Sequence, residues 1–265
     1  MHNGAIMSSE VRHLVDVGQA YPLLRLTGVL DADTAPAVRS ALLDVLAGQP
    51  EALVVDVGDL RVSAPEAVTV LSDLRRDTID WPAARLALCG AQNGLWRDAG
   101  WPVWPDSASA FAALGAPDQD RRLSVTLEPQ LGAARRTREL INDACDRWNR
   151  SELAGPACIV ATEMVNNVVA HAHTPMTILL AAHDAGLSVA VRDHSAVIPR
   201  YTGGPVSPTA YGGRGMLLID SVAGRWGSLP LTDGKVVWAL LTAENAPSAV
   251  DDQRGGTSMA DPARG

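Results

Sequence analysis

The hydrophobic pattern of this chain changes near residue 118, and this change limits the folds available to it. Before it, short apolar runs alternate with amphipathic helical segments, which predicts crossover connections and a mainly parallel sheet. After it, two long helical segments precede two strand pairs joined by short turns, which predicts helices on one face of a mostly antiparallel sheet. We therefore expect an α/β domain over 13–117, a linker over 118–122 and an α+β two-layer sandwich over 123–243.

Apolar periodicity and turn residues predict the individual elements. In the first domain, Asp33 or Thr34 is expected to cap the first helix and Gly48 to end it. Strands are expected over 23–31, 52–57, 83–90 and 102–104, and helices over 34–48, 65–80, 92–100 and 107–115. The second domain is expected to contain a strand over 123–129, helices over 130–149, 155–173 and 214–223, and strand pairs over 176–194 and 225–243. Residues 1–12 and 244–265 are expected to be disordered tails.

Composition narrows the class of protein. The formal net charge of −8 argues against a chain that coats nucleic acid. Cys89, Cys145 and Cys158 lie far apart and form no CxxC pair, which favours buried thiols in a reducing compartment. No apolar run approaches the roughly 18 residues of a membrane span, and the first residues hold no signal-peptide core. We expect a cytoplasmic protein that contacts neither nucleic acid nor membrane directly.

The helix expected over 155–173 carries a polar stripe. Glu163, Asn167 and His171 follow at intervals of four and share one helix face, while apolar residues supply the buried side. An amide oxygen is a ligand that Mg²⁺ accepts, and a carboxylate can orient or deprotonate a nucleophile. A merely solvated stripe is the alternative. His171 and His173 lack a third ligand at suitable spacing, so a zinc site is disfavoured.

Two further features follow along the chain. Glycines lead directly into the helix expected over 214–223, in the run YGGRGMLLID, and backbone N–H groups at such a start can hold phosphates. This run matches neither GxGxxG nor the P-loop pattern, and a flexible hinge is the alternative. Asp193 ends the strand VAVRD, where its carboxylate can accept from the amino group of a base or cap the next turn.

The order and spacing of these features resemble the Bergerat (GHKL) ATP-binding fold, and more narrowly the bacterial anti-sigma factor serine kinases. ATEMVNNVVAHAH stands at the N box, VRDHS at the first glycine box and GGRGMLLID at the second. The resemblance implies that ATP and Mg²⁺ bind and that residues 195–211 form a lid. It makes Glu163 the general base and Asn167 the Mg²⁺ ligand. The nucleotide would further contact Asp193, through the adenine amino group, and Gly213, Arg214, Gly215 and Met216, near the phosphates.

This chain departs from the family pattern at two places. His194-Ser195-Ala196 replaces the glycine turn after Asp193. The family often has a threonine beside the adenine in the last strand, whereas here Gly234-Lys235 is followed by Val236.

The first domain resembles the STAS fold of anti-sigma factor antagonists. GVLDADTAPAVRSALLDVL, ALVVDVGDL and LALCG carry the resemblance. In that family D-L-S-x-L precedes a D-S-S-G turn whose second serine accepts phosphate. Aligning DVGDL on this pattern places Glu66 at the acceptor position, and Ser63 is the hydroxyl nearby. A glutamate there carries negative charge without a transferable hydroxyl, so we expect a module held in a phosphorylated-like state. A docking surface with no such role for Glu66 is the alternative.

Together the resemblances imply an ATP-binding anti-sigma regulatory factor with serine/threonine-protein kinase activity in a bacterial partner-switching system that regulates sigma-factor-dependent transcription. The implied partners are a sigma factor, a separate STAS antagonist or both, and a homodimer is a further expectation. The alternative is a non-catalytic ATP-sensing scaffold whose STAS domain is a phosphomimetic docking module. We expect neither a histidine kinase nor a gyrase-like ATPase, because this sequence shows no phosphoacceptor-histidine helix and no transducer domain.

Overall fold

The computed structural model describes residues 10–91, 94–184, 186–197 and 214–243. Most of the expected N-terminal tail, the whole C-terminal tail and most of the expected lid lie outside the described residues. The side chain of Arg214 also lies outside them.

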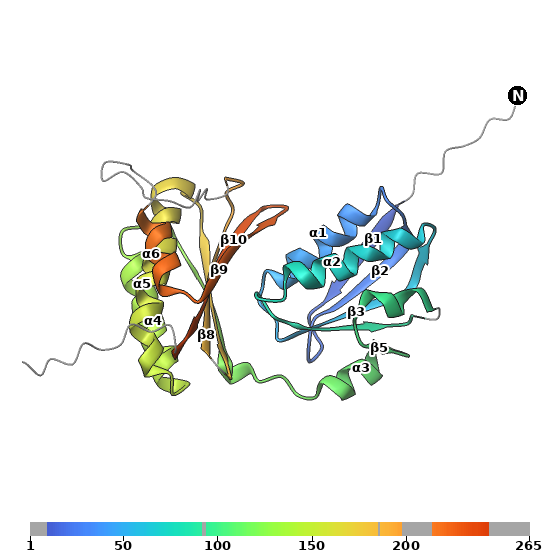
Figure 1. Cartoon of the computed structure of the whole chain (residues 1–265), viewed down its shortest axis with the longest axis horizontal. Coiled ribbons are helices and arrows are strands. Elements are labelled where there is room, and N and C mark those ends of the chain that lie inside the picture. Colours follow the sequence, from blue (N-terminus) through green and yellow to red (C-terminus); the bar gives the residue numbers. More distant parts are fainter. Residues whose placement is uncertain (1–9, 92–93, 185, 198–213, 244–265) are drawn as a thin grey trace, which may run out of the picture.

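The first domain is built on a five-stranded sheet with the strand order β1-β2-β3-β4-β5. Only β1 runs antiparallel to its neighbour, so the expected mainly parallel sheet is confirmed. Helices α1 and α2 cover one face of this sheet, and α3 covers the other (Figure 1). The strands are β1 (Val11–Asp16), β2 (Leu23–Leu30), β3 (Ala52–Val62), β4 (Arg85–Cys89) and β5 (Val103–Trp104), and the helices are α1 (Ala35–Leu46), α2 (Thr69–Asp77) and α3 (Ser107–Leu114).

Several boundaries in this domain differ from the expected ones. Strand β1 begins at Val11, inside the expected tail, and both of its faces are largely exposed, so no apolar alternation marked it in the sequence. The segment expected as one helix over 65–80 starts with a 3-10 turn, η1 (Pro65–Val68), before α2, and the helix expected over 92–100 is a 3-10 segment, η2 (Gly94–Ala99). The expected linker holds a short 3-10 turn, η3 (Gln119–Arg121).

The expected start of α1 is confirmed by position. Thr34 is the N-cap residue, but its side chain makes no capping hydrogen bond. Its hydroxyl instead donates to the carbonyl of Val29 (2.9 Å), while Asp31 accepts hydrogen bonds from the amides of Asp33 and Thr34 at 3.1 and 3.0 Å. At the other end α1 stops at Leu46 and Ala47 is its C-cap, so the helix ends shortly before Gly48, and Gln49 takes a left-handed φ of 53°.

The second domain contains a fully antiparallel sheet with the order β6-β7-β8-β10-β9. Helices α4, α5 and α6 cover one face of it, and a shared apolar core lies between the two layers (Figure 1). The strands are β6 (Arg122–Leu127), β7 (Met176–His183), β8 (Gly186–Asp193), β9 (Arg225–Leu231) and β10 (Gly234–Thr242), and the helices are α4 (Ala133–Arg147), α5 (Ser151–Asn167) and α6 (Arg214–Val222).

Helix α5 begins four residues before its expected start and carries Pro156 in its interior. A π-helical turn, η4 (Val168–Ala172), continues it. Contrary to the sequence expectation, Ser151–Ala172 is, among the described residues, long and apolar enough by length and composition to cross a membrane. Val160 and Val165 on this helix are nevertheless fully buried in the core between the helices and the sheet, as in the central helix of a globular domain.

The first domain covers the other face of the second sheet. Leu179, Ala190, Val236 and Trp238 point away from the helices of their own domain and join the apolar cluster of α1 and α2. The side chain of Gln49 donates to the Ser188 hydroxyl, and its carbonyl accepts from Arg122 at 2.7 Å. An ion pair between Asp80 and Arg225 forms a second polar link. The second sheet is therefore buried on both faces.

Candidate functional site

The predicted polar face of α5 is present at Glu163 and Asn167. Both side chains are half-buried, while Met164 and Val165 between them point into the core. The helix supplies this arrangement because residues four apart lie one above the other on the same face. These two residues therefore stand on the side of α5 that meets α6.

His171 lies beyond α5, in the turn that follows Asn167. There the helix widens into the π turn η4, in which the amide of His173 bonds to the carbonyl of Val168, five residues back. His171 and His173 are both exposed, and the described residues contain no cluster of three or more histidine, cysteine or acidic side chains that could hold a metal.

Helix α6 packs its first turn against Glu163 and Asn167. A Cβ at Gly215 would lie only 2.6 Å from Oε2 of Glu163, so glycine is what allows this close approach. The Asn167 amide Nδ2 lies 3.9 Å from the sulfur of Met216, which is itself buried. The structure thus brings together Glu163 and Asn167 of α5 with Gly215 and Met216 of α6. Gly213 lies outside the described residues, and Arg214 begins α6.

Asp193 ends β8, and its side chain lies on the face of the sheet that α5 and α6 cover. In both sheet pairings the residue opposite it is buried: Met176 on β7 and Lys235 on β10. Oδ1 of Asp193 accepts from the Ser195 amide and from Nζ of Lys235, both at 2.8 Å. Asp193 is 2% exposed and Lys235 is 5% exposed, so this is a buried ion pair.

Gly234 makes this pairing possible. Its φ is +150°, and a Cβ there would lie 2.0 Å from the carbonyl oxygen of Asp193. Only glycine therefore allows β10 to approach β8 closely enough to place Lys235 beside Asp193. From the sequence alone, Lys235 is visible only within a departure from the family pattern. One signal was available, since Lys235 is the sole lysine of a chain with 22 basic residues.

A second charged group lies next to this pair. Asp233 accepts from Arg192 at 3.1 and 3.3 Å and lies 3.3 Å from Nδ1 of His194. Partial burial acts to raise the pKa of Asp233, but the hydrogen bonds from Arg192 and the nearby His194 bring that pKa below its ordinary value. The negative charge at the β9–β10 turn is therefore balanced locally.

The two groups of polar residues lie at one side of the domain. Glu163 and Asn167 project from α5, and Asp193 and Lys235 project from the strands toward the helix layer, since Val191 and Val237, two residues along, belong to the core beneath α5. Two residues of that core contact the polar groups: Met176 lies opposite Asp193 on β7, and the sulfur of Met216 lies beside Asn167. The arrangement sets a carboxylate and an amide near the start of a helix, with a buried charged pair at the strand ends.

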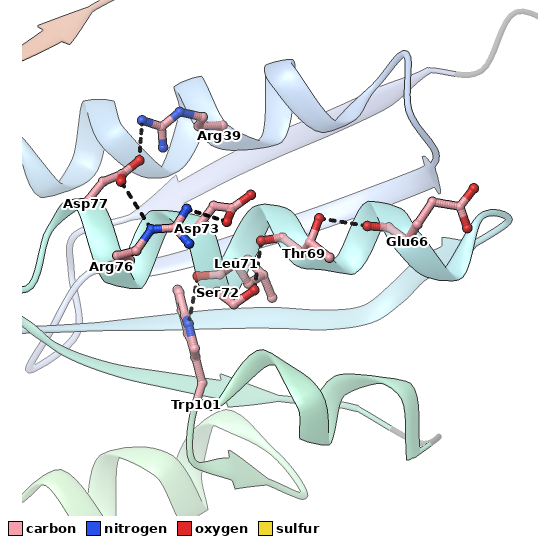
Figure 2. A network of polar contacts seen from close by, with 9 residues as sticks. All are labelled: Arg39, Glu66, Thr69, Leu71, Ser72, Asp73, Arg76, Asp77 and Trp101. Atoms are coloured by element: carbon pink, nitrogen blue, oxygen red, sulfur yellow. Dashed lines mark hydrogen bonds and ion pairs between the residues drawn. The ribbon is translucent and has the colours of Figure 1, made fainter.

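Glu66 lies in the first domain, in the exposed turn η1 that leads into α2. Figure 2 shows its carboxylate directed away from the helix, while its backbone carbonyl accepts from the Thr69 hydroxyl at 2.8 Å. About 17 Å of helix separate it from Asp77, and Asp80 just beyond contacts the second domain. Glu66 therefore stands at the end of α2 remote from the second domain.

The three cysteines are free, as expected. Burial raises the pKa of the Cys145 thiol to about 11, and burial followed by the nearby Asp56 carboxylate raises that of Cys89 to about 12. These thiols remain protonated at neutral pH and act as small core residues.

No protein-family model and no curated protein matches this chain. Among solved structures, it is similar to an anti-sigma factor antagonist from Mycobacterium paratuberculosis, at 21% identity over 39% of this chain and 93% of that one, with a TM-score of 0.34. It is also similar to the RsbU and RsbW domains of a Mycobacterium tuberculosis protein, at 15% identity and a TM-score of 0.35, over 48% of this chain. This chain spans 32% of that second structure. Likenesses of this strength say nothing about activity.

Proposed function

We propose that this chain is an ATP-binding regulator of a partner-switching system, in which the second domain binds nucleotide and phosphorylates serine on a STAS protein. The observation that carries the proposal is the packing of Gly215 against Glu163, with Asn167 beside Met216. It supports a Bergerat-type site because a carboxylate and an amide meet the glycine-led start of a helix, where backbone N–H groups favour anions.

The residues present are suited to Mg²⁺. Asn167 directs its side-chain Nδ2 toward Met216. Within the described part of the chain, its side-chain oxygen Oδ1 accepts no hydrogen bond. Such an oxygen is a ligand that Mg²⁺ accepts, together with phosphate oxygens and water. When bound, the ion would neutralise charge on the phosphates.

In this proposal Glu163 acts as the base. The serine oxygen would attack the γ-phosphorus, its proton would pass to the Glu163 carboxylate, and ADP would leave with the electrons of the broken P–O bond. The glycine at position 215 keeps the carboxylate against the first turn of α6. The proposed partners are a separate STAS antagonist as acceptor and a sigma factor as the protein released or held.

The position of Glu66 supports transfer between molecules. Glu66 lies at the end of α2 away from the second domain. The nucleotide site proposed in the second domain of the same chain therefore does not face it. A partner docking on this end would meet a carboxylate at a helix start, which resembles a phosphorylated serine in sign of charge. This favours a second candidate, an ATP-sensing switch in which the first domain is a phosphomimetic docking module.

Calorimetric titration of the full chain with ATP and ADP, with and without Mg²⁺, tests nucleotide binding. We expect Asn167→Ala to abolish the Mg²⁺-dependent part of the binding heat. Asn166→Ala is the matched control, since Asn166 is the exposed neighbour on the same helix and should bind as the parent does. Absence of heat with either nucleotide would refute both candidates.

Radiolabelled ATP separates the two candidates. The acceptor is this chain with Glu66→Ser and Glu163→Gln, which restores a hydroxyl and removes the proposed base. We expect the parent chain to label it and a chain with Glu163→Gln alone to bind ATP without labelling it. Glu152→Gln, an exposed position on α5, is the control for loss of a carboxylate. Binding without any transfer would favour the non-catalytic switch.

A further inference from the structure

The buried pair of Asp193 and Lys235 has a chemical consequence for the base that this site takes. The two side chains lie opposite each other in the antiparallel pairing of β8 and β10, so they stand on the same face of the sheet. Nζ of Lys235 lies 2.8 Å from Oδ1 of Asp193, and the side chains are 7% and 2% exposed. A buried ion pair of this kind is fixed in place, because separating it would leave an unpaired charge in the interior.

Each partner has hydrogen-bonding capacity left over. The ammonium of Lys235 has three N–H donors. Two of them bond to Oδ1 of Asp193 and, at 3.2 Å, to the carbonyl of Ser195. Oδ1 also accepts from the Ser195 amide. Among the described residues, the third N–H finds no acceptor and Oδ2 of Asp193 finds no donor. This acceptor and this donor are therefore both available to a ligand.

The pair thus offers one acceptor beside one donor. Adenine presents the complementary edge, since its exocyclic amino group donates and the neighbouring ring nitrogen N1 accepts. In a 6-oxopurine such as hypoxanthine or guanine both positions are reversed: a carbonyl would face the Asp193 carboxylate, and an N–H would face the Lys235 ammonium. This arrangement opposes like groups and leaves two buried charges unsatisfied.

We propose that Lys235 is a specificity-determining residue that donates a hydrogen bond to N1 of adenine, while Oδ2 of Asp193 accepts from the amino group. This inference rests on the proposed nucleotide site and adds to it the residue that reads the base. It also accounts for the choice of the chain's sole lysine among its many arginines, because a compact ammonium fits beside a buried carboxylate where the larger planar guanidinium does not.

The experiment removes the proposed hydrogen bond either from the nucleotide, at N1, or from the protein, at Lys235, and compares the two losses of affinity. Calorimetry on the full chain measures the affinities for ATP, for 1-deaza-ATP, which lacks the N1 acceptor, and for ITP, which carries the 6-oxo edge. In the parent chain we expect 1-deaza-ATP and ITP to bind about ten- to a hundredfold more weakly than ATP. In Lys235→Met we expect ATP to weaken by a similar factor and to bind no better than 1-deaza-ATP.

Arg192→Met is the matched control. It removes a cation from the neighbouring position on β8, whose partner is Asp233, and should keep the parent preference for ATP. Thermal unfolding reports whether Lys235→Met leaves a folded chain. If it does not, the comparison of the three nucleotides on the parent chain still decides the matter.

The outcomes separate cleanly. Absence of binding by all three nucleotides contradicts the proposed function. Equal binding of ATP and 1-deaza-ATP by the parent chain contradicts the role of Lys235 alone and leaves nucleotide binding intact. Tighter ATP binding by Lys235→Met would show that the lysine blocks the base. Tighter binding of ITP than of ATP by the parent chain would show that the site recognises a 6-oxopurine. Either result overturns the inference.

Discussion

At the scale of single residues, two glycines place the chemistry of the candidate site. Gly234 lets β10 approach Asp193, and Gly215 lets α6 approach Glu163. The glycines that lead into α6 predict a phosphate-binding segment, but their pattern does not show that one of them contacts the predicted base. That contact joins residues 52 positions apart, and no local pattern encodes it.

Gly215→Ala tests whether this approach matters for function more than for stability. The new Cβ would collide with Oε2 of Glu163, which is the mobile end of a side chain and can move at small cost. Alanine also favours helix by up to about 1 kcal/mol. We expect the free energy of unfolding to change by less than about 1 kcal/mol, whereas transfer of label to the acceptor chain falls about ten- to a hundredfold because the base is displaced.

Gly155→Ala is the control for this prediction. Gly155 lies in α5, and a Cβ there meets no atom within 4 Å. It should stabilise the helix slightly and leave label transfer unchanged. A Gly215→Ala chain that transfers label at the parent rate would contradict the placement of Glu163 as base.

At the scale of elements, predictions succeeded where apolar residues repeat with a clear period. The strands of the second sheet, the hairpin between β7 and β8 and the helices α4 and α6 all lie within their expected ranges or overlap them closely. Helix α5 starts at Ser151, earlier than expected, and holds Pro156 in its interior. Strand β1 was missed because exposure on both faces leaves no alternation to detect.

The site was predictable in part for the same reason. Glu163 and Asn167 share a face because they follow a helical period, and that could be inferred from spacing. The π turn η4, which carries His171, could not be predicted, since nothing local distinguishes it from a further turn of α-helix. The pair of Asp193 and Lys235 depends on the register between β8 and β10, which is set by long-range strand pairing.

The exposed start of α2 predicts whether phosphate transfer to residue 66 occurs within one chain or between two chains. If Glu66→Ser restores an acceptor, its labelling by ATP should be intermolecular, because the turn η1 faces away from the second domain of its own chain. The initial rate per mole of the Glu66→Ser chain should therefore fall in proportion to dilution. A rate per mole that is independent of concentration would mean transfer within one chain.

Ser63 requires a control in that experiment. It is the nearest hydroxyl, and it is exposed, with its Oγ donating to the carbonyl of Leu30 at 3.3 Å. The chain with Ser63→Ala and Glu66→Ser should be labelled as fast as the chain with Glu66→Ser alone. Loss of label would assign the phosphate to Ser63.

At the scale of the whole molecule, the two domains share one buried interface. Ala190 and Trp238 of the second sheet lie in the same apolar cluster as Leu42 and Leu46 of α1. This contact could not be predicted from the sequence, because the residues that face the first domain alternate with core residues on strands that are apolar throughout. The composition of such strands shows that both faces are buried, but it does not identify what buries them.

This interface predicts that the chain unfolds as one cooperative unit. Ala190→Glu places a carboxylate at a position with 0% exposure on the face of β8 that meets the first domain, away from the α4–α6 core. Burying an unpaired charge is costly, so we expect the domains to separate while each keeps its own core. Differential scanning calorimetry should show one transition for the parent chain and two for Ala190→Glu, with faster proteolysis between residues 115 and 122.

Leu131→Glu adds the same charge at a site that is 99% exposed and should keep the single transition. Two transitions in the parent chain would mean that the domains fold independently, and the second sheet would then have a face free for another protein.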